Sequence, residues 1–248
     1  MATNFNRRAV SNEYSTDTDT THEGLRQYML SVYNYMASGL LLSGVVAFAI
    51  ANTSIISLFF RIDDTGRLAG YSGLGMISMF LPLGLIIFMS FTWQKRSAKS
   101  LELLYWLFVG TMGIGLSTIL LTYTGVSVAR TFVITAGAYS ALSLYGYTTK
   151  KDLSGFGTFL LMGLVGLIIA TIVNMIWPTN MMGFIIPVIG VLIFSGLTVY
   201  DTQRIKSVYF QVQGSAVENN TAVMGAVSLY LNFVNLFQFL LMFLGNRE

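Results

Sequence analysis

The sequence has no cysteine, few charged residues and a single histidine, and each shortage excludes a class of function. Without cysteine there is no disulfide, no thiolate metal ligand and no cysteine nucleophile. The one histidine, His22, lies in a polar stretch near the N-terminus, so histidine-based catalysis or metal binding is not expected. The basic residues are scattered and the net charge is only +3, so no basic stripe is available for DNA or any other nucleic acid.

Hydrophobic residues make up 54% of the chain and charged residues only 10%. A soluble domain has about 25% charged residues, so this chain has too few to cover a surface that faces water. The lipid bilayer is therefore its expected surrounding.

The first 24 residues are polar and lack the apolar core of a cleavable signal peptide. We expect residues 1–24 to form a disordered cytoplasmic tail, because they bury too little apolar surface to offset their ordering entropy. Residues 25–248 are expected to form one transmembrane domain. The segment 24–33 is predicted to be a short interfacial helix that leads into the first span.

Seven apolar runs approach the roughly 20 residues that cross a bilayer as a helix. They are residues 34–58, 71–93, 103–123, 131–147, 156–176, 182–200 and 223–244. The fourth is the shortest, but its small residues suit close packing between helices. Transmembrane strands are not expected, because the runs lack alternating polarity. The sequence predicts an all-α membrane protein with seven transmembrane helices.

The distribution of lysine and arginine predicts the orientation of these spans. Ten of the 14 basic residues fall on one side of the seven-span arrangement: Arg7, Arg8, Arg26, Lys95, Arg96, Lys99, Lys150, Lys151, Arg204 and Lys206. The other side has Arg61, Arg67, Arg130 and Arg247. We expect the N-terminus in the cytoplasm and the C-terminus outside.

The last apolar run carries a polar stripe. Gly225, Ser228, Asn232 and Asn235 fall within about 80° on a helix that turns 100° per residue. A polar stripe at this depth is costly in lipid, so we expect the seventh span to be the central helix of the bundle. The sequence leaves open whether the stripe makes interhelical hydrogen bonds or lines a polar cavity or ion path.

An acid stands at the end of the sixth run. Asp201 follows the uncharged residues 182–199, on the expected cytoplasmic side. It is either a solvated acid paired with Arg204, or an acid turned inward toward the seventh span that binds a cation or a proton. Lys95 and Arg96, at the cytoplasmic end of the second span, are alternative basic partners, and the sequence does not decide among them.

Four stretches carry a family resemblance: YMASGLLLSG (35–44), TFVITAGAYSALSLYGYTTKKDLSGFG (131–157), VYDTQRI (199–205) and LYLNFVNLFQFLLMFLG (229–245). With them the chain resembles the bacterial branch of the Bax inhibitor transmembrane family. The resemblance implies a seven-helix fold with the last helix central and wrapped by the others. It also implies a pH-sensitive calcium leak, controlled by two aspartates near the cytoplasmic end that share a proton.

Only one of these two aspartates is present here. Asp201 matches the first, whereas Asn232 stands at the position of the second. An asparagine keeps the shape but does not titrate, and it gives a calcium ion less charge to bind. We therefore expect Asp201, Asn232 and Asn235 to form the ion or proton gate, with calcium leak weakened or lost. The sequence does not identify metal ligands and implies no bound cofactor, so Ca²⁺ enters only as a transported or weakly held ion.

A second function remains open. Some bacterial relatives in the resembled family restrain a membrane-anchored ATP-dependent protease, so the chain could be a non-conducting regulator of such a protease or of another membrane partner. An enzyme is not expected, because the spans contain no histidine, no pair of acids and no Gly-x-Ser-x-Gly motif. The expected location is the bacterial inner membrane.

Overall fold

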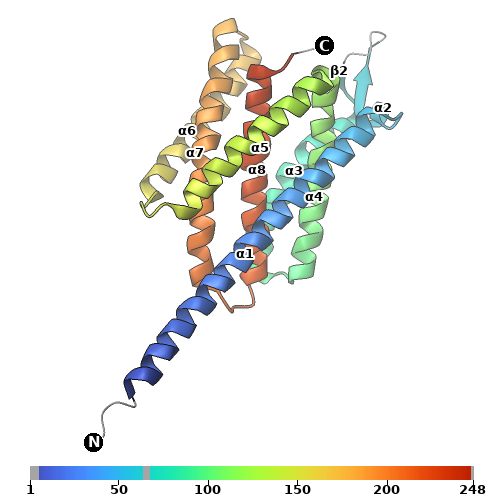
Figure 1. Ribbon diagram of the computed structural model, residues 1–248. Helices are drawn as coiled ribbons and strands as arrows, with labels where there is room; N and C mark the ends of the chain where they lie inside the picture. Colours follow the sequence, from blue (N-terminus) through green and yellow to red (C-terminus); the bar gives the residue numbers. More distant parts are fainter. Residues whose placement is uncertain (1–5, 64–67, 247–248) are drawn as a thin grey trace, which may run out of the picture.

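The computed structural model describes residues 6–63 and 68–246, with side chains from residue 23 onward. These residues are helical apart from one small hairpin and short connections (Figure 1). In chain order the elements are α1 (Asn6–Ala51), α2 (Ile56–Phe59), β1 (Phe60–Ile62), β2 (Leu68–Tyr71), α3 (Gly73–Thr92), the 3-10 turn η1 (Trp93–Lys95), α4 (Ala98–Thr122), α5 (Gly125–Thr148), α6 (Ser154–Ile176), α7 (Asn180–Val212) and α8 (Glu218–Leu244).

The prediction of an all-α membrane protein is confirmed. The seven predicted runs fall on seven long helices, α1 and α3 to α8. Six of these are long and apolar enough to cross a membrane, namely Glu23–Ala51, Gly73–Lys95, Ala98–Thr122, Ser154–Ile176, Asn180–Val212 and Glu218–Leu244. The fourth predicted span lies on α5, which is not among the six.

The first helix differs from its prediction at both ends. The segment 24–33 is no separate interfacial helix, because α1 runs through it without a break. Its Tyr28 is buried and packs on Tyr209 of α7, with ring centroids 5.2 Å apart. At the other end, α1 stops at Ala51 instead of continuing to residue 58, because Asn52 and Thr53 bond back to the helix carbonyls of Phe48 and Ala49.

The expected disorder of residues 1–24 stays a prediction. The backbone of α1 begins at Asn6, residues 1–5 lie outside the described part of the chain, and side chains are described only from residue 23.

The sixth predicted run is longer than expected. The sequence predicts a span over 182–200 with Asp201 at its end, but α7 continues to Val212. Ile205 and Tyr209, four residues apart, are both buried and hold the extension against the bundle. The connection to α8 is therefore only residues 213–217, and not 201–222. At about 50 Å, α7 is longer than the roughly 30 Å hydrocarbon core and must extend beyond it.

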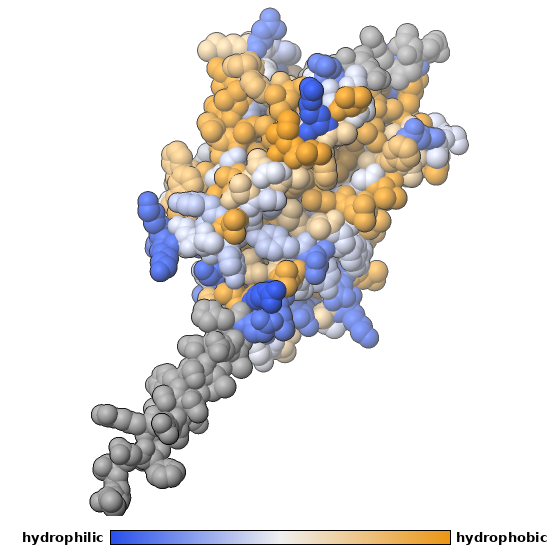
Figure 2. Space-filling view, viewed as in Figure 1, coloured by the Kyte–Doolittle hydropathy of each residue, from blue (hydrophilic) through white to orange (hydrophobic). Residues whose placement is uncertain are grey.

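Most of the long helices pack against α8, and the others pack on helices that do. α8 contacts α1, α4, α5 and α7, whereas α3 packs on α4 and α6 packs on α7. In Figure 1, α1 and α5 cross the bundle obliquely in front of α8. On the face in Figure 2, hydrophobic side chains dominate the upper part and hydrophilic ones gather toward the lower end. The apolar surface is what a bilayer would cover.

Close contact between α1 and α4 depends on a glycine. A Cβ added at Gly113 would lie 2.7 Å from both the Ser43 carbonyl oxygen and Val46 Cβ, which is too close without a shift of α1. A Cβ at Gly110, one turn earlier on α4, would meet nothing within 4 Å. The two glycines therefore form a matched pair for testing the contact.

We predict that Gly113→Ala lowers the melting temperature of the detergent-solubilised protein, by an amount equivalent to about 1–3 kcal/mol of overpacking. Gly110→Ala should leave it unchanged or raise it slightly, because alanine favours a helix by up to about 1 kcal/mol over glycine. Equal melting temperatures for the two variants would contradict close packing at Gly113.

Candidate functional site

Asp201 lies between α7 and α8 and has two partners. Asn232 Nδ2 of α8 donates a hydrogen bond of 2.7 Å to Asp201 Oδ2. Arg204 Nη2, one turn along α7, lies 2.8 Å from Asp201 Oδ1. Asp201 and Asn232 are buried, with 8% and 5% of their surfaces exposed. The two alternatives for Asp201, pairing with Arg204 and turning inward, thus occur together.

Arg204 reaches the acid from the edge of the bundle. Its side chain is 46% exposed, against 11% for the side chain of Asp201. The same Nη2 also donates to Ser228 Oγ of α8 at 3.2 Å. One guanidinium therefore neutralises the buried carboxylate and ties α7 to α8.

The other basic candidates do not contact Asp201. Arg96 donates to Thr92 Oγ1 at 3.1 Å and to Ser100 Oγ at 3.0 Å, and Lys95 is exposed on η1. Within residues 23–63 and 68–246, the ion-pair partner of Asp201 is Arg204. The proposal of Lys95 or Arg96 as the partner is therefore wrong, because both lie on the α3–α4 connection with other neighbours.

Asn235 takes part in the site less directly than expected. Its Nδ2 donates to the carbonyl of Leu231 in its own helix at 2.8 Å, and not to Asp201. It still faces the same cavity as Asp201 and Asn232. The polar stripe on α8 therefore both bonds to another helix and lines a cavity.

This cavity, of about 640 Å³, lies between α3, α6, α7 and α8. Its polar lining is Asp201, Arg204, Ser228, Asn232, Asn235 and Thr171. Its walls are apolar and include Leu83 and Ile86 of α3 and Leu161, Leu164 and Ile168 of α6. The cavity is thus polar mainly where α7 and α8 line it and apolar where α3 and α6 line it.

The stretch VYDTQRI joins α7 to its neighbours at almost every residue. Thr202 Oγ1 lies 3.1 Å from Ser143 Oγ of α5. A Cβ at Gly146 of α5 would clash with the carbonyl of Val199, and one at Gly157 of α6 would clash with the Tyr200 ring. These contacts fix the position of the Asp201 backbone relative to α5 and α6.

Gln203 of the same stretch binds the α5–α6 connection. Its Nε2 donates to the Lys151 carbonyl at 2.7 Å, and its Oε1 accepts from the Leu153 N–H at 3.1 Å. In that connection, hydrogen bonds from the hydroxyl and N–H of Ser154 hold the pKa of Asp152 below its usual value. The bonded connection fixes where α6 begins.

A chain of hydroxyl groups joins α1, α5 and α7 at Thr202, the residue that follows Asp201. Tyr33 of α1 bonds Ser143 of α5, Ser143 contacts Thr202 of α7, and Thr202 donates to the Thr198 carbonyl at 2.8 Å. Sequence reasoning missed Ser143, Thr202 and Gln203 as parts of the site. The available signal was their position inside 131–157 and 199–205, two of the stretches that carry the resemblance.

The site has one acid whose two oxygens are both bonded. A calcium ion prefers six to eight oxygen ligands with negative charge among them. Among the residues described, no group of three acidic or histidine side chains could hold a metal ion. A cation could bind Asp201 only by displacing Arg204 or recruiting amide and hydroxyl oxygens from the cavity.

Several known proteins match almost the whole chain. It is 48% identical over 227 residues to an uncharacterised protein of Caulobacter vibrioides, covering 91% of each chain. It is 43% identical over 229 residues to the uncharacterised protein RP147 of Rickettsia prowazekii, covering 92% of this chain and 93% of the relative. It is 42% identical over 229 residues to inner membrane protein YbhL of Escherichia coli, covering 91% of this chain and 94% of the relative.

The family comparison agrees with these relatives and with the motif around Asp201. Residues 25–248 match the family model described as inhibitor of apoptosis-promoting Bax1. The match begins at Leu25, a buried residue of α1, and includes both partners of the buried acid. The chain therefore belongs to this family, the Bax inhibitor family.

Proposed function

We propose that the chain is a multi-pass protein of the bacterial inner membrane with seven spans, α8 being the central one. The name of the YbhL relative supports the location. The start of α1 and the end of α8 lie at opposite ends of the bundle, and this supports an odd number of crossings (Figure 1). α5, with 24 residues and a length of about 36 Å, is long enough to be the seventh.

The N-terminus then lies in the cytoplasm. Most lysines and arginines fall on that side, as the positive-inside rule requires. On this assignment Asp201 and Arg204 lie toward the cytoplasmic half of α7, and the C-terminal turns of α7 extend out of the hydrocarbon core. The exposed part of Arg204 can then be hydrated from the cytoplasm.

The proposed activity is a slow cation leak, with calcium among the ions, that passes Asp201 and is held closed by Arg204. The observation that carries this proposal is the placement of the guanidinium on the buried carboxylate, at 2.8 Å. The Arg204 charge occupies the place where a permeating cation would bind. Opening then requires Arg204 to leave, and its 46% exposure gives it a route toward water.

Asn232 changes how such a gate responds to pH. Two contacting carboxylates cannot both ionise cheaply, so one proton is retained near neutral pH. The Asn232 amide donates to Asp201 without carrying a proton that titrates. We therefore propose that this chain keeps the gate contact but has a weaker pH response and weaker calcium leak than a protein with two aspartates.

The first test restores the second carboxylate. We predict that Asn232→Asp raises calcium flux into liposomes about tenfold, because a second charge near the path favours cations. The flux should also become dependent on pH between about pH 6 and pH 8. Asn235→Asp is the matched control: it adds a charge to the same cavity without contacting Asp201, so it should not produce the pH dependence that a pair of contacting carboxylates gives. Flux in Asn232→Asp equal to the parent would refute the proposal.

The second test removes the blocking charge. We predict that Arg204→Gln increases cation flux several-fold over the parent, because Asp201 loses its counter-charge while Asn232 still holds it in place. The double variant Asp201→Asn with Arg204→Gln should return the flux to the parental level or below. Arg96→Gln, a basic residue that does not touch Asp201, is the control. Unchanged flux in Arg204→Gln, with the fold intact by melting temperature, would contradict the gate.

The alternative function is regulation of a membrane-anchored ATP-dependent protease without conduction. The contact of Asp201 with the amide of Asn232, in place of a second acid, favours it, because regulation needs no titrating pair. The N-terminal region is the proposed contact.

We predict for this alternative that deleting residues 1–22 abolishes binding to the purified protease, while α1 from Glu23 onward keeps the bundle folded. Binding is measured by co-purification from liposomes that contain both proteins, with the full chain as the reference. Flux that is unmeasurable in both the parent and Arg204→Gln, together with this loss of binding, would favour regulation over the leak.

A further inference from the structure

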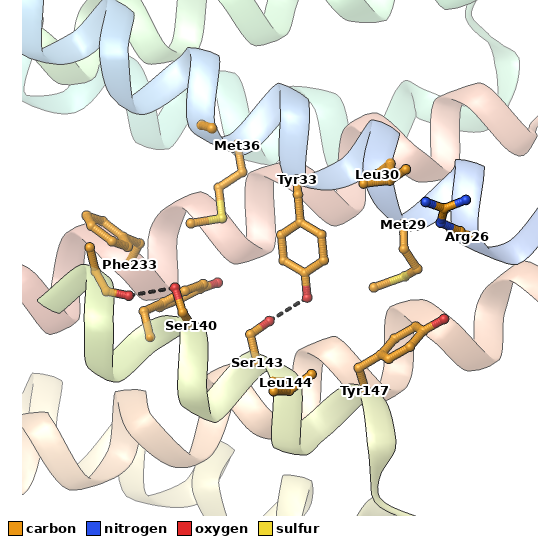
Figure 3. A pocket seen from close by; sticks show the side chains of 13 residues that line it. Arg26, Met29, Leu30, Tyr33, Met36, Ser140, Ser143, Leu144, Tyr147 and Phe233 are labelled. Atoms are coloured by element: carbon orange, nitrogen blue, oxygen red, sulfur yellow. Dashed lines mark hydrogen bonds between the residues drawn. The ribbon is translucent and has the colours of Figure 1, made fainter.

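A second groove lies between α1 and α5, separate from the cavity at Asp201. Its volume is about 600 Å³, and Phe233 of α8 contributes to its floor. The other lining residues are Arg26, Met29, Leu30, Tyr33, Met36 and Ala37 of α1, and Ala136, Tyr139, Ser140, Ser143, Leu144 and Tyr147 of α5. Figure 3 shows Tyr33 reaching across from α1 to bond Ser143 of α5.

The groove changes in character along its length. Arg26 and Tyr147 lie at one end, Tyr33 and Ser143 lie in the middle, and Phe233 lies at the other end (Figure 3). Beyond Phe233 a further groove of about 580 Å³ continues between the same two helices. Its lining is apolar throughout: Ala37, Leu40, Leu41, Gly44, Val45, Phe48, Phe132, Ala136 and Phe233.

Positive charge gathers at the polar end. Arg26 is exposed, and its contact with Glu23 at 3.6 Å is a surface ion pair of small energetic value, so the guanidinium is available to a ligand. Lys206 Nζ donates to the Tyr147 carbonyl at 2.8 Å and lies 5.1 Å from the centre of its ring. Lys150 lies two residues after the end of α5 and is exposed. Among the side chains described, from residue 23 onward, Glu23 is the acid that pairs with Arg26.

The length of the groove matches one leaflet. Arg26 and Ala37 are on one continuous helix, eleven residues and thus about 16 Å apart. Half of a hydrocarbon core is about 15 Å. Because α1 is oblique in the bundle, the depth is less than this axial length, so when Arg26 lies at headgroup level the apolar end of this groove lies within the hydrocarbon core of the same leaflet.

We propose that this groove binds an anionic phospholipid, with the headgroup at Arg26 and Lys206 and one acyl chain between α1 and α5. Basic pockets between transmembrane helices on the cytoplasmic side suit anionic headgroups. The Tyr33 and Ser143 hydroxyls lie just below the charged end, where they can reach the ester oxygens of the glycerol. A soluble anion would leave the apolar lining uncovered, and an uncharged lipid would leave the basic end without a partner.

The test compares lipids on the full-length purified protein in detergent. Native mass spectrometry measures bound phosphatidylglycerol, which is anionic, and phosphatidylcholine, which has no net charge. We expect phosphatidylglycerol to bind at least about fivefold more tightly than phosphatidylcholine, because one basic residue near a membrane surface strengthens the binding of anionic lipid by about this factor. Arg26→Gln should remove most of this preference, whereas Arg130→Gln, at the exposed start of α5, should not.

A second pair of variants tests the groove itself. Ala37→Phe fills the groove where its two parts meet and should abolish retention of either lipid. Ala49→Phe adds the same ring to an exposed position of α1 outside both grooves and should bind as the parent does. The proposal is overturned if the two lipids bind alike, if Arg130→Gln acts like Arg26→Gln, or if Ala37→Phe retains phosphatidylglycerol as the parent does.

Discussion

The arrangement of the bundle depends on one buried carboxylate. Asp201 lies in an apolar helix pair, where an unpaired charge would be costly. Its two oxygens are bonded by Arg204 from the same helix and by Asn232 from the next, so α7 and α8 can meet only in the register that brings these groups together. Removing one partner of such a pair costs about 3–5 kcal/mol when the pair is fully buried, and less here because Arg204 is half exposed.

The residues around Asp201 also pack closely against other helices. The residues on either side of it in VYDTQRI contact α5 and α6, through Thr202, Gly146 and Gly157. The same short stretch therefore positions the proposed ion gate and joins three helices. A substitution in it would alter activity and stability together, which is why the flux tests include variants of Asn235 and Arg96, residues that do not contact Asp201.

Much of the fold could be predicted from the sequence, because long apolar runs mark the helices and the stripe on α8 marks its polar face. The contact between Asp201 and Asn232 followed from two family motifs. The length of α7 could not be predicted. Gln203, Arg204 and Lys206 interrupt the apolar pattern, so the sequence does not indicate that Ile205 and Tyr209 are buried. The sequence left open whether Arg204 pairs with an inward acid, since the reach of a long side chain depends on the position of the neighbouring helix.

The position of α8 in the chain has a consequence for biogenesis. Chains fold from the N-terminus as they are synthesised, yet the helix that contacts α1, α4, α5 and α7 is the last one made. Until it inserts, Asp201 lacks Asn232, the Tyr139 hydroxyl lacks the Leu229 carbonyl, and Ser43 lacks the Tyr230 hydroxyl. The earlier helices must therefore remain in the membrane as a partly open assembly that closes only when α8 has left the ribosome and inserted.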